Sequence, residues 1–353
     1  MSEPASIPDR SEAVTAEWLS DALATSVGTE VTKVEVLDQH SGTTGRMRLG
    51  LEYAGAGDGP ESVFVKLAPF DESQRQLVAV TDMGRREARF YEGPALEAPL
   101  RIPRPYFATH GDDPSEYVMV LEDLSASGCT FTTRLEPHGP ERVGQLIESL
   151  ARLHAHFWDD SRFGDELSWV QPAMRGPFGA KLIGNAREQF ADQFPPVFAA
   201  LCDLYVEHHA RIAELWDEGE QTLIHGDTHA GNQFVDDGQV GLYDWAVISR
   251  SPGIRDVAIY LGNSCPAELR EEGQEEWLGR YRRVLVEAEV DAPSAEVLWN
   301  RYRMGVLYAW VAATTTASMG SKWQPIEVGM TGMTRATDAC ADLETVEAIR
   351  AAL

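Results

Sequence analysis

The sequence predicts an α+β protein with two lobes, a small N-terminal lobe built on an antiparallel sheet and a larger, mainly helical lobe. Three β-rich segments follow one another at 31–39, 47–53 and 62–69, and glycine-containing turns separate them. Later in the chain the apolar residues recur at helical spacing. A length of 353 residues suits two lobes that each bury a core. We expect the first lobe over 1–122 and the second over 123–353.

The first lobe is expected to begin with a helix. Thr15 can accept a hydrogen bond from the first turn, and the apolar residues Trp18, Leu19 and Leu23 then fall on one face. A second helix is expected over 84–93. Prolines and a glycine after it favour extended and turn conformations, and a strand at 117–124 leads out of the lobe.

The second lobe begins with a helical pattern at 141–158, where apolar residues follow the 3.6-residue repeat. Two segments, 222–235 and 238–247, are expected to form short strands around a polar loop. Further helices are expected at 255–263, 275–289, 294–316 and 344–353.

The charge of the chain bears on its partners. Thirty Lys and Arg stand against 56 Asp and Glu, so the formal net charge is −26. Such a surface repels nucleic-acid phosphates and anionic membranes, and we expect neither as a partner. We attribute the charge to solubility rather than to an acidic site for cationic substrates.

The cysteines and the N-terminal sequence bear on location. Cys129, Cys202, Cys265 and Cys340 lie far apart without a CxxC pair, which disfavours a disulfide framework and a thiolate zinc site. The first residues carry no basic patch followed by an apolar run, and no stretch of 18 apolar residues occurs. We expect a protein of the reducing cytoplasm.

Three polar residues stand in an order that suits phosphoryl transfer. Asp227 and Asn232 are five residues apart in HGDTHAGN, and Asp244 follows in GLYDW. Phosphoryl transfer needs a carboxylate to orient or deprotonate the acceptor hydroxyl and oxygen ligands to hold magnesium against the phosphates. An Asp, an Asn five residues later, a hairpin and a second Asp is the arrangement found in kinase-like folds.

The segment IHGDTHAGN followed by YDWA resembles the aminoglycoside phosphotransferase and choline kinase-like superfamily. That resemblance implies a protein-kinase-like two-lobe fold and a kinase that uses ATP and Mg²⁺. It implies Asp227 as catalytic base, with Asn232 and Asp244 as magnesium ligands. GTP stays open as an alternative nucleotide.

Two upstream residues agree with the resemblance. Lys66 ends the apolar strand SVFVKL, where kinase-like folds keep the lysine that contacts the α- and β-phosphates. Glu87, in EARFY, resembles the helical glutamate that pairs with this lysine, and Glu92 and Glu97 are nearby alternatives. A strand lysine alone would be an edge residue with an exposed head group.

The nucleotide is expected to contact two further segments. The turn SGTTGR joins the first two strands and contributes Gly42, Thr43, Thr44 and Gly45. Its glycines allow backbone N–H groups to approach phosphate oxygens closely. The resemblance places backbone groups near Glu122 and Leu124 at the adenine edge. The chain has no GxxxxGK[ST] sequence, which excludes a P-loop NTPase.

The acceptor is less well defined. LEDLS, EARFY and LARLHAHFW resemble the ecdysteroid kinase-like branch, which favours a small hydrophobic or amphipathic alcohol. An aminoglycoside, choline or another amino alcohol is the alternative. The sequence gives no indication of the oligomeric state.

Residues around the loop have expected supporting roles. His225 is expected to brace the loop by a hydrogen bond, and Asp256 resembles the helical aspartate that ties to it. His229 stands where protein kinases of the HRDLK type place a lysine, so it is a candidate catalytic residue that donates to the γ-phosphate. The alternative is a histidine bonded to a loop carbonyl.

Two other classes of function compete with a kinase. His225, Asp227 and His229 form an HxDxH run, which four further histidines could complete as a metal-hydrolase site: His154, His156, His208 and His209. That reading leaves Lys66 and Asp244 without a role. A catalytically dead kinase serving as a binding module is the other alternative, and the complete Lys, Asp, Asn and Asp set argues against it.

Overall fold

The computed structural model describes most of the chain, in five stretches: 6–55, 59–133, 139–173, 176–320 and 325–353. The chain folds into two compact units. Unit 1 consists of Met1–Thr130, Phe234–Gly238 and Leu242–Val247, and unit 2 of Phe131–Gln233, Gln239–Gly241 and Ile248–Leu353. Phe234–Gly238 and Leu242–Val247 thus belong to the first unit. The expected division placed every residue after 122 in the second lobe.

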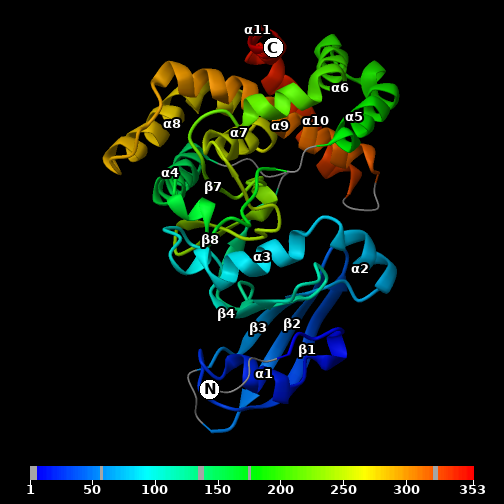
Figure 1. The fold of residues 1–353 in the computed structure, drawn as a ribbon, viewed down its shortest axis with the longest axis vertical. Helices are drawn as coiled ribbons and strands as arrows, with labels where there is room; N and C mark the ends of the chain where they lie inside the picture. The colour runs from blue at the N-terminus through cyan, green and yellow to red at the C-terminus, as the bar shows by residue number, and fades with distance from the viewer. Residues whose placement is uncertain (1–5, 56–58, 134–138, 174–175, 321–324) are drawn as a thin grey trace. The chain divides into compact units, whose positions relative to one another are not determined.

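Unit 1 is built on a five-stranded antiparallel sheet in the order β1-β2-β3-β5-β4 (Figure 1). Its strands are β1 (Val31–Ser41), β2 (Gly45–Tyr53), β3 (Ser62–Leu67), β4 (Pro105–His110) and β5 (Tyr117–Glu122). The first three and the last confirm the sequence prediction. β4 was expected only as extended chain; it forms an edge strand, where a proline at the first position costs no ladder hydrogen bond.

The helices of unit 1 pack beside this sheet. They are η1 (Ser11–Ala13), α1 (Ala16–Leu23), α2 (Glu72–Ala79), α3 (Met83–Glu92) and η2 (Pro94–Leu96). The Thr15 hydroxyl accepts a hydrogen bond from the Trp18 N–H at 3.2 Å, as expected for a cap. α1 buries Leu19 and Leu23 in one core with the sheet residues. α3 lies beside β4 and β5 (Figure 1).

Three short strands lie where the chain passes from one unit to the other. They are β6 (Thr130–Phe131), β8 (Gln233–Asp236) and β9 (Gln239–Leu242). The segment that carries Asp244 belongs to unit 1, whereas the loop that carries Asp227 belongs to unit 2.

Unit 2 is mainly helical, and within it β7 (Thr222–Ile224) pairs with β10 (Ser249–Ser251) in an antiparallel ladder. Its longer helices are α4 (Pro140–His156), α5 (Pro177–Phe190), α6 (Pro196–Trp216), α7 (Ile254–Asn263), α8 (Ala267–Glu287), α9 (Ala295–Ser318), α10 (Ile326–Asp342) and α11 (Thr345–Ala352). Its short 3₁₀ helices are η3 (Ser161–Gly164), η4 (Ala191–Gln193) and η5 (Ala230–Asn232). Every residue of α7 is buried, so this helix forms the centre of the unit.

The helices α4, α7, α8, α9 and α11 confirm the sequence prediction. α5, α6 and α10 were not predicted. α5 and α10 each contain two glycines, which lower helix propensity. The small antiparallel sheet and the larger helical part confirm the expected α+β class. In the described part of the chain, no helix is both long and apolar enough to cross a membrane. The four cysteines are buried and unbridged.

Candidate active site

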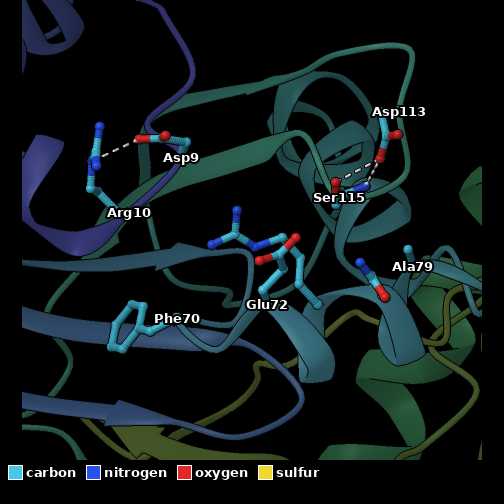
Figure 2. Close-up of a pocket in the computed structure, with 9 residues that line it drawn as sticks. Asp9, Arg10, Phe70, Glu72, Ala79, Asp113 and Ser115 are labelled. Carbon is cyan, nitrogen blue, oxygen red and sulfur yellow. Dashed lines mark hydrogen bonds and ion pairs between the residues drawn. The ribbon is translucent and has the colours of Figure 1, made fainter.

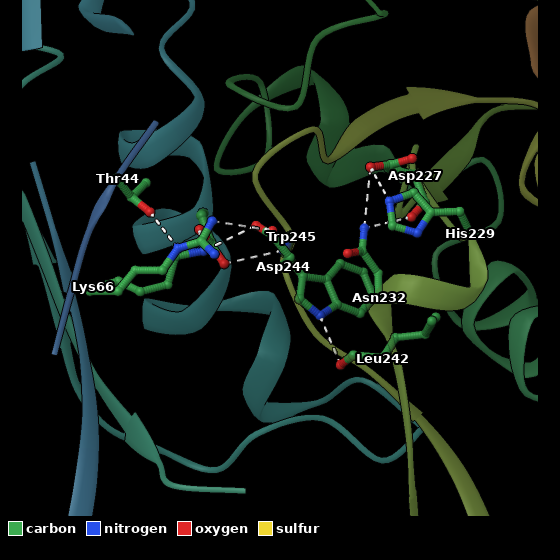
Figure 3. A network of polar contacts seen from close by, with 10 residues as sticks. Thr44, Lys66, Asp227, His229, Asn232, Leu242, Asp244 and Trp245 are labelled. Carbon is green, nitrogen blue, oxygen red and sulfur yellow. Dashed lines mark hydrogen bonds and ion pairs between the residues drawn. The ribbon is translucent and has the colours of Figure 1, made fainter. Parts of the chain in front are cut away.

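A buried ion pair joins β3 to α3 in unit 1. The Lys66 Nζ lies 2.5 Å from Glu87 Oε2, and the two side chains are only 5% and 1% exposed. A second carboxylate contacts the same ammonium, because Asp244 Oδ1 lies 3.0 Å from Lys66 Nζ (Figure 3). Lys66 therefore pairs with Glu87, as the resemblance implied, and not with the nearby alternatives Glu92 or Glu97.

The charge on Lys66 is strongly favoured. Burial opposes a charged ammonium, but the carboxylates of Asp244 and Glu87 more than offset that cost and raise the pKa of Lys66 above its ordinary value. Lys66 is thus a cation at any physiological pH. Its ammonium is held in one place by two acidic groups from different segments of unit 1.

The backbone presents Asp244 in an unusual conformation. Its φ is +64°, in the left-handed region that Asp tolerates better than most residues. The next residue fixes this conformation: the Trp245 N–H donates to Glu87 Oε1 at 3.2 Å, and its indole stacks on Phe90 with ring centroids 4.0 Å apart. The Asp244 side chain remains 30% exposed. The segment therefore holds one carboxylate against Lys66 and leaves part of it accessible.

A second cation, Arg46, approaches Asp244 from β2. Its Nη2 lies 4.0 Å from Asp244 Oδ2, and its Nε donates to the Thr44 hydroxyl at 3.0 Å. Arg46 was not among the predicted site residues. The strand register could have identified it, because Arg46 pairs directly with Lys66 across β2 and β3, and such partners share one face of a sheet.

The glycine-containing turn has a packing reason for one of its glycines. A Cβ on Gly45 would lie 2.4 Å from the Phe70 ring and 2.7 Å from the Ala68 carbonyl oxygen, closer than real contacts allow. Gly42 has no comparable neighbour, since the nearest atom would be 3.6 Å away. Thr44 is buried and holds Arg46. The expected contact of Gly42, Thr43, Thr44 and Gly45 with nucleotide stays a prediction.

The two expected adenine-side residues lie at the end of β5 and just after it. The Glu122 carboxylate pairs with Arg101 at 2.7 Å and accepts the Arg104 N–H at 3.0 Å. Burial opposes its charge, but these partners lower the pKa of Glu122 below its ordinary value. Leu124 packs in a small cluster with Cys129 and Phe234. Because these contacts occupy the side chains, the predicted nucleotide contacts concern the backbone.

A separate cavity of about 600 Å³ lies in unit 1 (Figure 2). Its lining consists of Asp9, Arg10, Phe70, Glu72, Arg75, Gln76, Ala79, Asp113 and Ser115. This lining includes none of the residues expected to bind nucleotide. The cavity is therefore distinct from the Lys66 cluster.

In unit 2, the loop between β7 and η5 presents Asp227, whose side chain is 37% exposed. The Asn232 amide donates to the Asp227 backbone carbonyl at 2.9 Å and to its Oδ2 at 3.2 Å. His229 Nε2 lies 3.2 Å from the same oxygen (Figure 3). Asp227, His229 and Asn232 thus form one polar cluster, with the carboxylate as its accessible member.

Asp256, at the start of α7, holds this loop from within the core. Its carboxylate accepts the backbone N–H groups of His225 and Gly226, each at 2.8 Å, and its carbonyl accepts the Thr228 hydroxyl at 2.6 Å. His225 Nδ1 accepts the Asp227 N–H at 3.2 Å. These bonds confirm the bracing role expected for His225 and the tie expected for Asp256.

A buried histidine holds Asp256 in turn, and a buried tyrosine holds that histidine. His154 on α4 contacts Asp256 Oδ2 through Nε2 at 3.2 Å and the Tyr281 hydroxyl through Nδ1 at 2.9 Å. Both nitrogens of His154 are therefore engaged in structural contacts. Within the described stretches, no group of three or more His, Cys, Asp or Glu side chains is arranged to hold a metal ion. From the sequence, His154 was a candidate only for the alternative metal-hydrolase site, and Tyr281 was not predicted to support this loop.

His229 makes a contact that neither of the two alternatives from the sequence included. Its Nε2 faces the Asp227 carboxylate, and its Nδ1 is buried without a hydrogen-bond partner among the described residues. This geometry makes His229 a support for the carboxylate of Asp227. Its contact with the transferred phosphate stays a prediction.

Replacing His229 with Ala is expected to lower kcat by roughly ten- to a thousandfold with little change in melting temperature, because a donor at the reacting groups is lost. Gln, which retains an amide donor of similar reach, is expected to recover part of that loss. The half-buried His208 on α6 provides an Ala control. A fall of several degrees in melting temperature with kcat near the parent value would show a purely structural histidine.

The comparisons with solved structures support the fold. A choline kinase from Cryptosporidium parvum Iowa II superposes with a TM-score of 0.55 at 11% identity, covering 90% of this chain and 92% of that chain. A putative aminoglycoside phosphotransferase from Ralstonia eutropha JMP134 has a TM-score of 0.54 at 12% identity, covering 92% and 97%. An ethanolamine kinase from Plasmodium vivax has a TM-score of 0.52 at 12% identity, covering 87% and 81%. The kinase-like two-lobe fold is thereby confirmed.

Sequence comparison gives the family. No curated protein sequence matched the chain. The sequence profile described as the phosphotransferase enzyme family matches residues 53–293, which is more than half of the chain. The resemblance to the aminoglycoside phosphotransferase and choline kinase-like superfamily is confirmed, whereas the ecdysteroid kinase-like branch stays a prediction. The chain belongs to the phosphotransferase enzyme family.

Proposed function

We propose that this protein is a small-molecule kinase that transfers the γ-phosphate of ATP to a hydroxyl group, with Mg²⁺ as cofactor and GTP as the alternative donor. The observation that carries the proposal is the buried Lys66 of this chain, which belongs to the phosphotransferase enzyme family. Two carboxylates hold its ammonium group, since Lys66 Nζ lies 2.5 Å from Glu87 and 3.0 Å from Asp244. A permanently charged, immobilised ammonium beside a partly exposed carboxylate suits a magnesium-bound polyphosphate.

Lys66 is the proposed contact of the α- and β-phosphates. Glu87 fixes the ammonium, so little side-chain entropy remains to be lost when a phosphate binds. The backbone of the turn 42–45 is proposed to contact the phosphates. The backbone near Glu122 and Leu124 is proposed to contact the adenine edge. These segments all belong to unit 1.

Asp244 and Asn232 are the proposed magnesium ligands, and their donor atoms fit the metal. Mg²⁺ prefers carboxylate and carbonyl oxygens. Asp244 offers a partly exposed carboxylate, and Asn232 uses its amide nitrogen toward Asp227, which leaves the side-chain oxygen as the ligand atom. When bound, the metal would neutralise charge that develops on the phosphates.

Asp227 is the proposed catalytic base. Its carboxylate accepts the proton of the acceptor hydroxyl as the hydroxyl oxygen bonds to the γ-phosphorus and the bond to the nucleoside diphosphate breaks. Asn232 and His229 hold Oδ2 in place, and Asp256 and His225 fix the loop backbone. The carboxylate is thus oriented before the acceptor arrives.

The proposed acceptor is a small alcohol of hydrophobic or amphipathic character, following the resemblance of LEDLS and EARFY to the ecdysteroid kinase-like branch. An aminoglycoside, choline or another amino alcohol is the second candidate, and one observation favours it. Neighbouring structures are named as a choline kinase, an ethanolamine kinase and a putative aminoglycoside phosphotransferase. Four buried, unbridged cysteines support a proposed location in the reducing cytoplasm.

A turnover assay tests the proposed function. Nucleoside diphosphate release is measured with ATP or GTP, with and without Mg²⁺, across a panel of hydrophobic alcohols, amino alcohols and aminoglycosides. The proposal predicts release that requires both Mg²⁺ and a hydroxylated acceptor. Nucleotide binding without turnover on any acceptor would favour a binding module, and hydrolysis that follows the zinc content would favour a metal hydrolase.

A further inference from the structure

Arg46 stands next to the proposed phosphate lysine but in a different environment. The antiparallel register pairs Arg46 on β2 with Lys66 on β3, so both side chains lie on one face of the sheet. The Lys66 side chain is 5% exposed, whereas that of Arg46 is 40% exposed. The cluster in unit 1 therefore has one buried cation and one that reaches solvent.

The guanidinium of Arg46 is oriented by a short local contact. Its Nε donates to the hydroxyl of Thr44 at 3.0 Å, and Thr44 itself is only 4% exposed. This contact engages Nε, and Nη2 lies 4.0 Å from Asp244 Oδ2. Lys66 contacts the other oxygen, Oδ1. Two cations thus share one carboxylate.

The charges in this cluster are balanced. Lys66 and Arg46 contribute two positive charges, and Glu87 and Asp244 contribute two negative ones. The contacts are unequal, because the buried Lys66–Glu87 pair is short whereas Arg46 meets Asp244 at 4.0 Å in a partly exposed position. Exposed ion pairs of that length are weak. Arg46 is therefore the member of the cluster that can exchange its partner at low cost.

Binding of the donor would change this balance. Under the proposed function, Asp244 becomes a metal ligand when the donor nucleotide binds. The metal, rather than Arg46, then balances the charge of Asp244. A magnesium-bound nucleoside triphosphate has a net charge of about −2, which calls for two cations. Guanidinium presents parallel N–H donors that match phosphate oxygens.

We infer that Arg46 is a second phosphate-binding cation, which exchanges Asp244 for the phosphates of the donor nucleotide. The inference rests on the proposed kinase function and extends it. Because the residue acts on the phosphate chain and not on the base, it favours nucleoside triphosphates over monophosphates.

Calorimetric titration of the full chain tests this role with two probes, a non-hydrolysable ATP analogue with Mg²⁺ and AMP. Arg46→Gln is expected to weaken binding of the analogue by about ten- to a hundredfold, since a charge-assisted contact is lost, and to change AMP affinity less than about threefold. Arg46→Lys is expected to recover part of the affinity. Arg85→Gln, which removes a cation ion-paired with Asp82 on α3, is expected to change neither affinity.

The possible outcomes separate this inference from the function on which it rests. A parent protein that binds neither probe overturns the proposed kinase function, and the inference with it. A parent that binds the analogue while Arg46→Gln binds it within about threefold overturns the inference alone. Equal weakening toward the analogue and AMP, or a lower melting temperature with unchanged affinity, shows that Arg46 supports the sheet rather than the phosphates.

Discussion

Replacement of Asp227 with Asn is expected to lower kcat by about a hundred- to ten-thousandfold, the usual contribution of a positioned general base. Asn keeps the size of the side chain and can still meet the amide of Asn232 and the imidazole of His229, so the loop should keep its shape. It lacks the negative oxygen that accepts the hydroxyl proton. Nucleotide affinity and melting temperature are therefore expected to stay near the parent values.

Steady-state kinetics on a responsive acceptor measure this effect, with calorimetry as the check on nucleotide binding. Asp203→Asn on α6 is the matched control, because Asp203 is an exposed residue of the same unit. If Asp227→Asn turns over within about threefold of the parent, Asp227 is not the base.

Replacement of Asp244 with Ala is expected to abolish the magnesium dependence of nucleotide binding. The carboxylate proposed to hold the metal against the phosphates is lost, whereas Lys66 keeps its pair with Glu87. The parent is expected to bind ATP more tightly with Mg²⁺ than without it, and the variant equally in both conditions.

Calorimetry with Mg²⁺ and with a chelator measures the difference. Asp21→Ala on α1, at an exposed position of the same unit, is the control. Equal ATP affinity with and without Mg²⁺ in the parent protein would remove the proposed role of Asp244.

Much of the fold and the Lys66–Glu87 ion pair could be predicted because short-range patterns encode them. β3 is an apolar strand with a lysine near its end, and α3 presents Glu87 on its buried face. The supports of the Asp227 loop were predictable only in part. His225 and Asp256 belong to recognisable segments, but the contacts of His154 with Asp256 and Tyr281 join residues more than 100 positions apart.

The missed features depend on register and on tertiary packing. Arg46 becomes important because it lies opposite Lys66, and that pairing depends on the register between β2 and β3. The requirement for Gly45 comes from the ring of Phe70, which no local pattern reveals. The acceptor stays least defined, since its selection depends on surface shape rather than on a motif.

The central claim is transfer of a phosphoryl group to a hydroxyl, and it can be followed directly with ATP that carries an isotope label in its γ-phosphate. Mass spectrometry of the acceptor after incubation with the parent protein and Mg²⁺ should show one added phosphoryl group containing the label, and Asp227→Asn should form it at a strongly reduced rate. An acceptor panel that gains no label, with any label recovered only as inorganic phosphate, would contradict the account.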